Sequence, residues 1–199
     1  LVALDGVPGD PERPRRTAVR FDAGDGALLA AEVDRDVGGA RIGVGHWRYT
    51  ARFAPLDDDA MRARGNHGAY GFVDTALGNV GDYVLRGFVR SGVAARRFNT
   101  FDRYAGTGLS ATGSWRDREL AVGLAVAYAR AGRVARALDP PRSKHETVVE
   151  LTTRIAVLPW LAIQPDLQYV VNPGLDSAAR DALAIGVRFE FLAGGSLRP

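Results

Sequence analysis

The sequence predicts an all-β protein, an antiparallel up-and-down transmembrane β-barrel with about ten strands in its 199 residues. Three observations predict this fold class. Apolar side chains alternate with small or polar ones along several segments, short and long connections alternate between these segments, and glycine accounts for 24 residues. A period of two places each class of side chain on its own face of a strand. Frequent glycine thins the side-chain layers, which is typical of barrels.

Nine segments follow an opening stretch, residues 1–5, that resembles the end of a further strand. In chain order, strands are expected at residues 26–34, 41–53, 67–77, 83–91, 100–112, 119–130, 146–157, 160–172 and 182–191. The alternation is clearest in the last segment, where one face carries Leu183, Ile185, Val187, Phe189 and Phe191. The three preceding segments repeat the pattern, and the first five show it more weakly.

The connections alternate in length. Short ones are expected at 35–40, 78–82, 113–118 and 158–159, and long ones at 6–25, 54–66, 92–99, 132–144 and 172–181. Outer-membrane barrels have short turns at one end and long loops at the other. Aromatic residues near the strand ends suit the two membrane interfaces: Tyr83, Trp115, Trp160, Phe189 and Phe191 at the short-turn end, and Tyr128 and Tyr169 at the long-loop end.

Composition excludes several classes of function. The 26 basic and 23 acidic residues are interleaved, which argues against a nucleic-acid surface. There is no cysteine, and three histidines without a ligand spacing predict neither a metal site nor a cofactor. No catalytic motif is present, and Glu146 and Glu150, about 13 Å apart on one strand face, are too distant for glycoside hydrolysis. We therefore expect no enzyme activity.

The chain is expected to be one domain, residues 1–199, cut from a larger protein, because it opens within a strand and carries no leader sequence. No apolar stretch is long enough to predict a transmembrane helix.

One block of sequence resembles a known family. The run HETVVELTTRIAVLPWLAIQPDLQYVVNPG, residues 145–174, is similar to the C-terminal signature of carbohydrate-selective porins of the OprB family: a strand of the form ExxLELTY, a PW turn, and QPDLQY…NPG. The stretches at 120–139 and 48–55 are weaker matches. The chain departs from the family pattern at Thr153, at Arg103, which falls on a face expected to meet lipid, and in a C-terminal extension, residues 193–199.

The resemblance implies the last ten strands of a sixteen-stranded barrel in the outer membrane of a Gram-negative bacterium. The implied function is diffusion of carbohydrates, glucose-type sugars, through a polar lumen. The implied partners are carbohydrates and outer-membrane lipid, and a homo-oligomer is left open.

A lumen that passes sugars needs side chains that donate and accept hydrogen bonds, and arginine's planar fork grips two hydroxyls at once. By alternation, the lumen-facing candidates are Glu32, Arg86, Arg90, Asp102, Glu146, Glu150, Arg154, Gln164, Asp166, Gln168, Arg188 and Glu190. Arg86 and Arg90 flank Phe88 on one face and are the first choice for direct sugar contact. For each candidate, the alternative role is a structural ladder of opposite charges across strands.

Two rival interpretations remain at this point. One is a complete small ten-stranded outer-membrane barrel with a structural, adhesive or enzymatic role, whose polar interior is filled by side chains. The other is a soluble β-barrel carrier with an apolar pocket. The side chains that face inward, and whether the sheet closes, distinguish the three.

Overall fold

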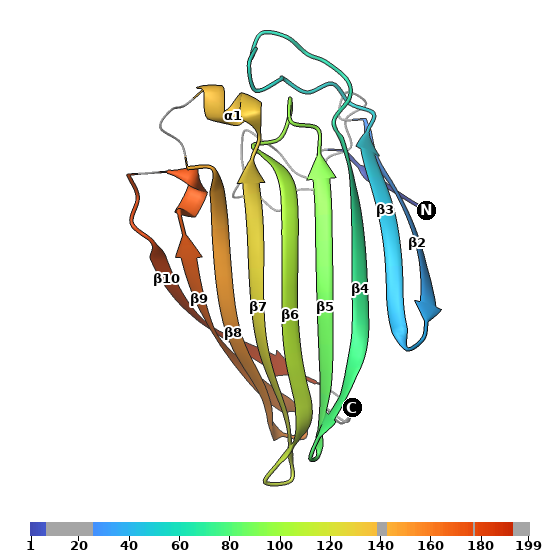
Figure 1. Cartoon of the computed structure of the whole chain (residues 1–199), viewed down its shortest axis with the longest axis vertical. Helices are drawn as coiled ribbons and strands as arrows, with labels where there is room; N and C mark the ends of the chain where they lie inside the picture. Colours follow the sequence, from blue (N-terminus) through green and yellow to red (C-terminus); the bar gives the residue numbers. More distant parts are fainter. Residues whose placement is uncertain (7–25, 139–142, 177, 193–199) are drawn as a thin grey trace.

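The computed structural model describes residues 1–6, 26–138, 143–176 and 178–192. Its elements are β1 (Val2–Asp5), β2 (Ala27–Val37), β3 (Ala40–Tyr49), β4 (His67–Val80), β5 (Tyr83–Ala94), β6 (Phe101–Trp115), β7 (Arg118–Ala131), α1 (Arg133–Leu138), β8 (His145–Leu158), β9 (Leu161–Val171), the 3-10 turn η1 (Pro173–Leu175) and β10 (Ala182–Phe191). The ten strands form one antiparallel sheet in sequence order (Figure 1). The prediction of an all-β antiparallel fold is confirmed.

Most strand boundaries fall close to the predicted ones, and the differences have local causes. Strands β4, β5 and β6 each run three residues further than expected because the connections between them are tighter than the sequence suggested. Strand β3 ends at Tyr49, four residues early, where the Thr50 backbone N–H donates to the Ala27 carbonyl oxygen at 2.9 Å. The long connection predicted at 132–144 contains α1. Residues 7–25 of the connection expected at 6–25 lie outside the described residues, as does the extension at 193–199.

Two of the two-residue turns at the short-turn end have left-handed backbone at both residues. Gly38 and Gly39 join β2 to β3 with φ of 60° and 85°, a conformation that glycine adopts without steric cost. The β6–β7 turn uses Arg116 and Asp117 at φ of 52° and 61°, which is uncommon for residues with a Cβ. There the Arg116 guanidinium lies 4.6 Å from the centre of the Trp115 ring, a cation–π contact that favours this turn.

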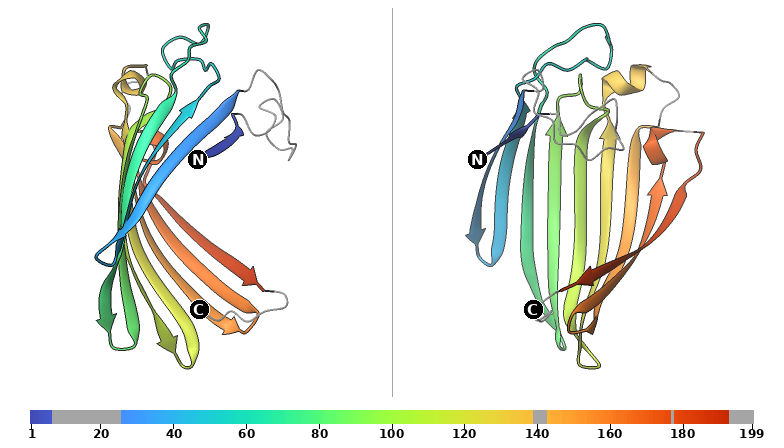
Figure 2. Two further views of the ribbon diagram at one scale, coloured as in Figure 1. Left: turned by 90° about the vertical axis from the view of Figure 1, so that its right-hand side faces the viewer. Right: turned by 180° about the vertical axis from the view of Figure 1, so that it is seen from behind.

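The two faces of the sheet differ in chemistry and in curvature. The apolar face carries aliphatic and aromatic side chains that stand clear of their neighbours: Val33 is 74% exposed and Ile185 76%. On the opposite, polar face, the Arg154 and Glu119 side chains are only 24% and 22% exposed, and the groups they pair with lie on strands of the same sheet. Side chains spread apart on a convex surface and converge on a concave one. The polar face is therefore the inside of the trough that Figure 2 shows.

This curvature puts the polar face inside and the apolar face outside. A soluble carrier with an apolar pocket requires the opposite arrangement, with its apolar face inside. Strands β1 and β10 occupy the two edges of the sheet and do not pair with each other, so the described strands do not form a closed ten-stranded barrel. None of the helices in the described part of the chain is long and apolar enough to span a membrane.

The small buried core of the described residues lies at the long-loop end instead of between two layers. Its buried members are Ala51, Pro55, Ala131, Ala135 and Leu175, and one further buried hydrophobic residue, Ala162, lies near the start of β9 at the other end of the sheet. Backbone hydrogen bonds tie the loops together above the strands, from the Leu56 N–H to the Arg97 carbonyl at 2.8 Å and from the Gly132 N–H to the Thr100 carbonyl at 2.9 Å. The loops thus fix the upper strand ends and leave the polar face below them open.

Candidate functional site

Strand register places most of the predicted site residues on the polar face. Phe88 is the Cα partner of Asp74 on β4 and of Gly108 on β6. Gly108 pairs with Ala125 on β7, and Ala125 with Glu150 on β8. Residues paired in this way project to the same side of a sheet. The same reasoning puts eleven of the twelve candidates on the polar face: Glu32, Arg86, Arg90, Glu146, Glu150, Arg154, Gln164, Asp166, Gln168, Arg188 and Glu190.

Asp102 is the exception. A register shift between Phe101 and Arg103 interrupts the β6–β7 ladder at this position, so alternation does not give its direction. Its Oδ1 lies 3.6 Å from Nε of Arg130, a residue whose strand position belongs to the apolar face. A bulge is invisible in an alternating sequence pattern, which is why the sequence assigned Asp102 to the lumen.

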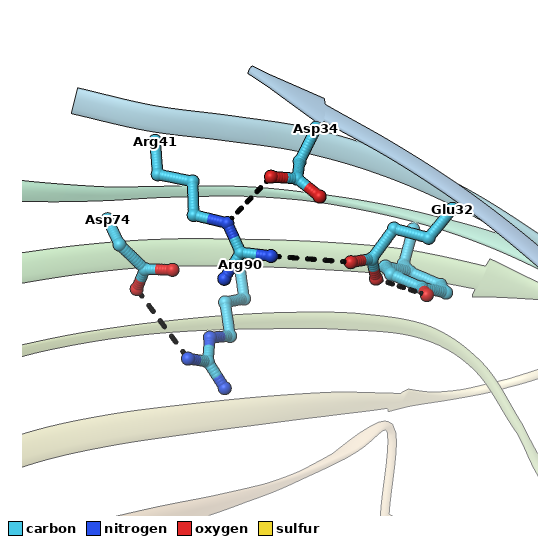
Figure 3. Close-up of polar contacts among 6 residues, drawn as sticks. Glu32, Asp34, Arg41, Asp74 and Arg90 are labelled. Carbon is cyan, nitrogen blue, oxygen red and sulfur yellow. Dashed lines mark hydrogen bonds and ion pairs between the residues drawn. The ribbon is translucent and has the colours of Figure 1, made fainter. Parts of the chain in front are cut away.

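The first of two polar groups spans β2 to β5, and we call it the Arg41–Arg90 cluster (Figure 3). Arg41 Nε donates to Asp34 Oδ1 at 2.8 Å, and its Nη2 lies 3.8 Å from Glu32 Oε1. Arg90 Nη2 lies 3.6 Å from Asp74 Oδ1. The Tyr70 hydroxyl donates to Glu32 Oε2 at 2.6 Å. The two arginine side chains remain 51% and 55% exposed, so both retain donors that face the open trough.

Aromatic rings hold these guanidinium groups over the sheet. Arg41 lies 5.4 Å from the centre of the Phe72 ring, and Arg90 lies 4.9 Å from that of Phe88. Glycine makes room for the rings, because a Cβ at Gly43 would collide with Phe72 and one at Gly108 with Phe88. A hollow of about 420 Å³ opens here, and its polar-face lining includes Glu32, Arg41, Tyr70, Asp74 and Arg90.

The second polar group spans β7 to β10, and we call it the Arg154 bridge. Arg154 on β8 donates to Glu119 Oε1 on β7 at 2.7 Å and to Glu190 Oε2 on β10 at 2.9 Å. The contact with Glu190 passes over β9 at Ala162, which is fully buried. Two further cross-strand bonds lie in the same region: Gln164 Nε2 to Thr152 Oγ1 and Gln168 Nε2 to Glu150 Oε2, both at 3.0 Å.

Small side chains separate the two polar groups. Along β6 and β7, the polar face carries Gly106, Gly108, Ser110, Gly123, Ala125 and Ala127. Above this floor lies a second hollow of about 420 Å³, bordered by Phe88 and Tyr104 on one side and by Glu150 and Thr152 on the other. The trough therefore has a lining of small residues here, and hydrogen-bonding groups stand along both sides.

The remaining candidates differ in how far their polar atoms are already engaged. Glu146 Oε2 accepts the Gly174 backbone N–H at 2.6 Å and so anchors η1. Asp166 projects toward Gly186, where any Cβ would collide with its carboxylate. Among the described residues, Arg86 and Arg188 are exposed and no carboxylate lies within 4.0 Å of their guanidinium nitrogens. Arg86 lines a smaller hollow of about 280 Å³ with Arg41, Asp74 and Ser110.

Several residues of the polar groups were not among the candidates: Asp34, Arg41, Tyr70, Asp74 and Glu119. Asp34 lies two residues from Glu32 on β2, and Glu119 lies two residues from Ala121 on β7, so each faces the same side as a residue assigned to the polar face. Alternation alone could have found them. The position of Asp74 depends on how β4 pairs with β5, where the register shifts between Ala76 and Gly78. The three-dimensional register resolves the facing of Asp74, because Asp74 is the Cα partner of both Arg41 and Phe88 on the polar face.

Comparisons with known proteins agree with this architecture. The sequence profile described as "Carbohydrate-selective porin, OprB family" matches residues 30–192. A search of curated proteins found no match. Among solved structures, the chain is similar to OprB of Pseudomonas putida, in the structure titled "High pH structure of Pseudomonas putida OprB", with a TM-score of 0.70 and 22% sequence identity. The alignment covers 83% of this chain and 48% of that one.

The family match supports a location in the outer membrane. It covers the strands from β2 to β10, including both polar groups and the floor between them. The chain therefore belongs to the OprB family of carbohydrate-selective porins.

Proposed function

We propose that the polar face is part of the wall of a pore through which small carbohydrates of the glucose type diffuse across the outer membrane. One observation carries the proposal most directly. Arg86 and Arg90 present donors on either side of the Phe88 ring, at the border of the small-residue floor. Arg86 has no carboxylate partner among the described residues, and Arg90 has one only at 3.6 Å.

This arrangement suits the chemistry of a sugar ring. A pyranose presents hydroxyl groups at its rim and C–H groups on its faces, so it fits a surface that offers hydrogen-bond donors beside an aromatic ring. The guanidinium fork donates to two neighbouring hydroxyls, and the Asp74 and Glu150 carboxylates accept from others. Each contact is exposed and replaces water, which keeps binding weak enough for rapid release.

We further propose that these ten strands complete their barrel with additional strands. The support is physical: strands β1 and β10 leave backbone N–H and C=O groups unpaired at the two edges, which lipid does not tolerate. The alignment with the P. putida chain covers only 48% of that chain, which supports the proposal that a sheet of this kind pairs with further strands.

Sugar flux into liposomes tests both proposals. The chain is reconstituted alone and, in parallel, fused behind the part of P. putida OprB that the alignment leaves uncovered. We expect glucose to enter vesicles with the fusion faster than protein-free vesicles, and little entry with the chain alone. A chain that stays monodisperse without detergent and conducts in neither form would contradict the pore.

Substitution of the two arginines tests the site itself. In the conducting form, the double change Arg86→Gln and Arg90→Gln is expected to raise the glucose concentration for half-maximal flux by about fivefold, from about 1 kcal/mol of lost hydrogen bonding. Arg35→Gln is the matched control, because Arg35 is an exposed arginine whose register partner Ile42 lies on the apolar face. Equal effects of the two changes would remove Arg86 and Arg90 from the sugar path.

A further inference from the structure

The apolar face ends in basic residues at the long-loop end of the sheet. The outermost apolar-face position is Arg48 on β3, His67 on β4, Arg103 on β6, Arg130 on β7 and His145 on β8. We call these five residues the basic belt. Strand β5 interrupts the belt with Val93, the Cα partner of Arg103. Below the belt, the same face is predominantly aliphatic.

The position of the belt relative to the membrane follows from strand length. On β6, Arg103 and Trp115 lie on the same face and are twelve residues apart, or about 40 Å along the strand. Strands of such barrels tilt by 35–45°, so the height between the two residues is about 30 Å. That is the thickness of the hydrocarbon core. Between them, the face carries Ala, Thr, Leu, Ala and Gly, none of which ionises.

With Trp115 at one interface, Arg103 therefore lies at the level of the lipid headgroups on the other side. The neighbouring Tyr128 ring supports this placement, because tyrosine concentrates at membrane interfaces. It stacks on His145 with ring centres 5.2 Å apart.

Two arginines meet one carboxylate of the described residues at this point. Arg103 and Arg130 are direct Cα partners, and like charges placed opposite each other destabilise a sheet. Asp102 lies 3.6 Å from Arg130, yet neither its Oδ1 nor Arg130 Nε makes a hydrogen bond in the described structure. No carboxylate of the described residues lies within 4.0 Å of the Arg103 guanidinium, whose residue is exposed. His145 follows as the next partner of Arg130.

We propose that Arg103, Arg130 and His145 form a binding site for the phosphate group of a lipid in the membrane leaflet at the long-loop end. An anion between the two arginines relieves their mutual repulsion. The acyl chains of the same lipid lie against the aliphatic face below. The site explains why a charged residue stands at position 103 on this face, because Arg103 has no carboxylate partner among the described residues.

Native mass spectrometry of the folded protein in detergent tests this proposal, using diphosphorylated lipid A and its phosphate-free form as probes. We expect the phosphorylated lipid to bind and the phosphate-free form to bind much more weakly. Arg103→Gln should weaken binding about fivefold, as expected for one arginine at an anionic surface. Arg103→Lys should restore most of it, and Arg35→Gln, at the other end of the same face, should leave it unchanged.

Three outcomes would overturn the proposal. Equal binding of both lipid forms would show that phosphate is not recognised, and saturation by inorganic phosphate without lipid would show a simple anion site. A dimer that dissociates on Arg103→Gln without any lipid effect would assign the surface to a second copy of the chain. Heat-dependent electrophoretic mobility confirms that each variant is folded. Because lipid binding is measured without sugar flux, its failure is distinguishable from failure of the pore.

Discussion

The Arg41–Arg90 cluster and the Arg154 bridge contain the same residue types on the same face, and they differ in how completely their charges are satisfied. In the bridge, one arginine meets two carboxylates at 2.7 and 2.9 Å, and its side chain is 24% exposed. In the cluster, Arg90 reaches its carboxylate only at 3.6 Å and stays 55% exposed. The bridge links three strands, whereas the cluster leaves donors directed into an open hollow.

The comparison shows that residue type does not decide between a structural and a binding role on a barrel wall. A guanidinium whose donors all bind protein carboxylates contributes to strand register and stability, because its removal leaves those carboxylates without hydrogen-bond partners. A guanidinium held by an aromatic ring and one distant carboxylate keeps donors for a ligand. Stability and transport measured on the same variants separate the two roles.

The largest effect is expected for Arg154→Ala. The change removes two short charged hydrogen bonds and leaves Glu119 and Glu190 half-buried without their partner. We expect the free energy of unfolding to fall by about 2–3 kcal/mol, measured by guanidinium titration of the folded protein in detergent or vesicles.

Arg188→Gln is the matched control for this stability measurement. Arg188 lies on the same face of β10, two residues from Glu190, and has no ion-pair partner among the described residues. Its substitution should change the unfolding free energy by less than about 0.5 kcal/mol. Equal losses for the two variants would mean that the bridge contributes nothing specific to stability.

An intermediate effect is expected from two glycines that are near neighbours on β3 and β4. A Cβ at Gly43 would collide with the Phe72 ring that supports Arg41, whereas a Cβ at Gly71 meets nothing closer than 3.5 Å. Gly43→Ala should therefore destabilise by about 1–2 kcal/mol through overpacking. Gly71→Ala should be neutral or stabilising by up to about 1 kcal/mol, because it restricts the unfolded chain.

Thermal unfolding of the two variants side by side checks this prediction. Since both residues lie within strands and have ordinary backbone angles, a common loss in both would point to backbone effects instead of the Phe72 ring. A loss of stability in Gly43→Ala alone, together with a higher glucose concentration for half-maximal flux, would show that the Phe72 ring positions Arg41.

The sequence predicted the strands and the composition of each face because both follow from a period of two, which burial on one side enforces. Alternation alone assigns residues such as Leu183 and Arg188 to opposite faces, since their strand has one uninterrupted register. At Asp102 a bulge breaks the period, so alternation does not determine which face its side chain takes and the lumen assignment stays a prediction. Asp74 was not among the candidates, and the strand to which it belongs shifts register further along.

Pairing across strands was beyond the sequence for a different reason. The Arg154 bridge joins residues 35 and 36 positions apart, and it depends on the stagger of four strands and on a small residue, Ala162, between two of them. The distinction between a satisfied and an available arginine is likewise a matter of distances. The alternating pattern therefore identifies the polar face, while the choice between ladder and binding site requires the register.

The smallest effect is expected for Asp74→Asn, which keeps the size of the side chain and removes its charge. Without the carboxylate, Arg90 loses its only ion-pair partner among the described residues and the polar face gains one net positive charge. We expect the anion-to-cation permeability ratio to rise about twofold, because wall charge concentrates the opposite ion in a pore. Reversal potentials in a KCl gradient across the conducting form measure this ratio.

Asp57→Asn is the control for that experiment, because Asp57 also pairs with one arginine, Arg97 at 3.8 Å, but lies in a loop beyond the strands. It should leave the permeability ratio unchanged. If both variants shift the ratio equally, the effect belongs to overall charge and Arg90 does not line the path. A shift confined to Asp74→Asn, with unfolding free energy altered by less than about 0.5 kcal/mol, would identify the Arg41–Arg90 cluster as a part of the wall that acts on the permeating solute.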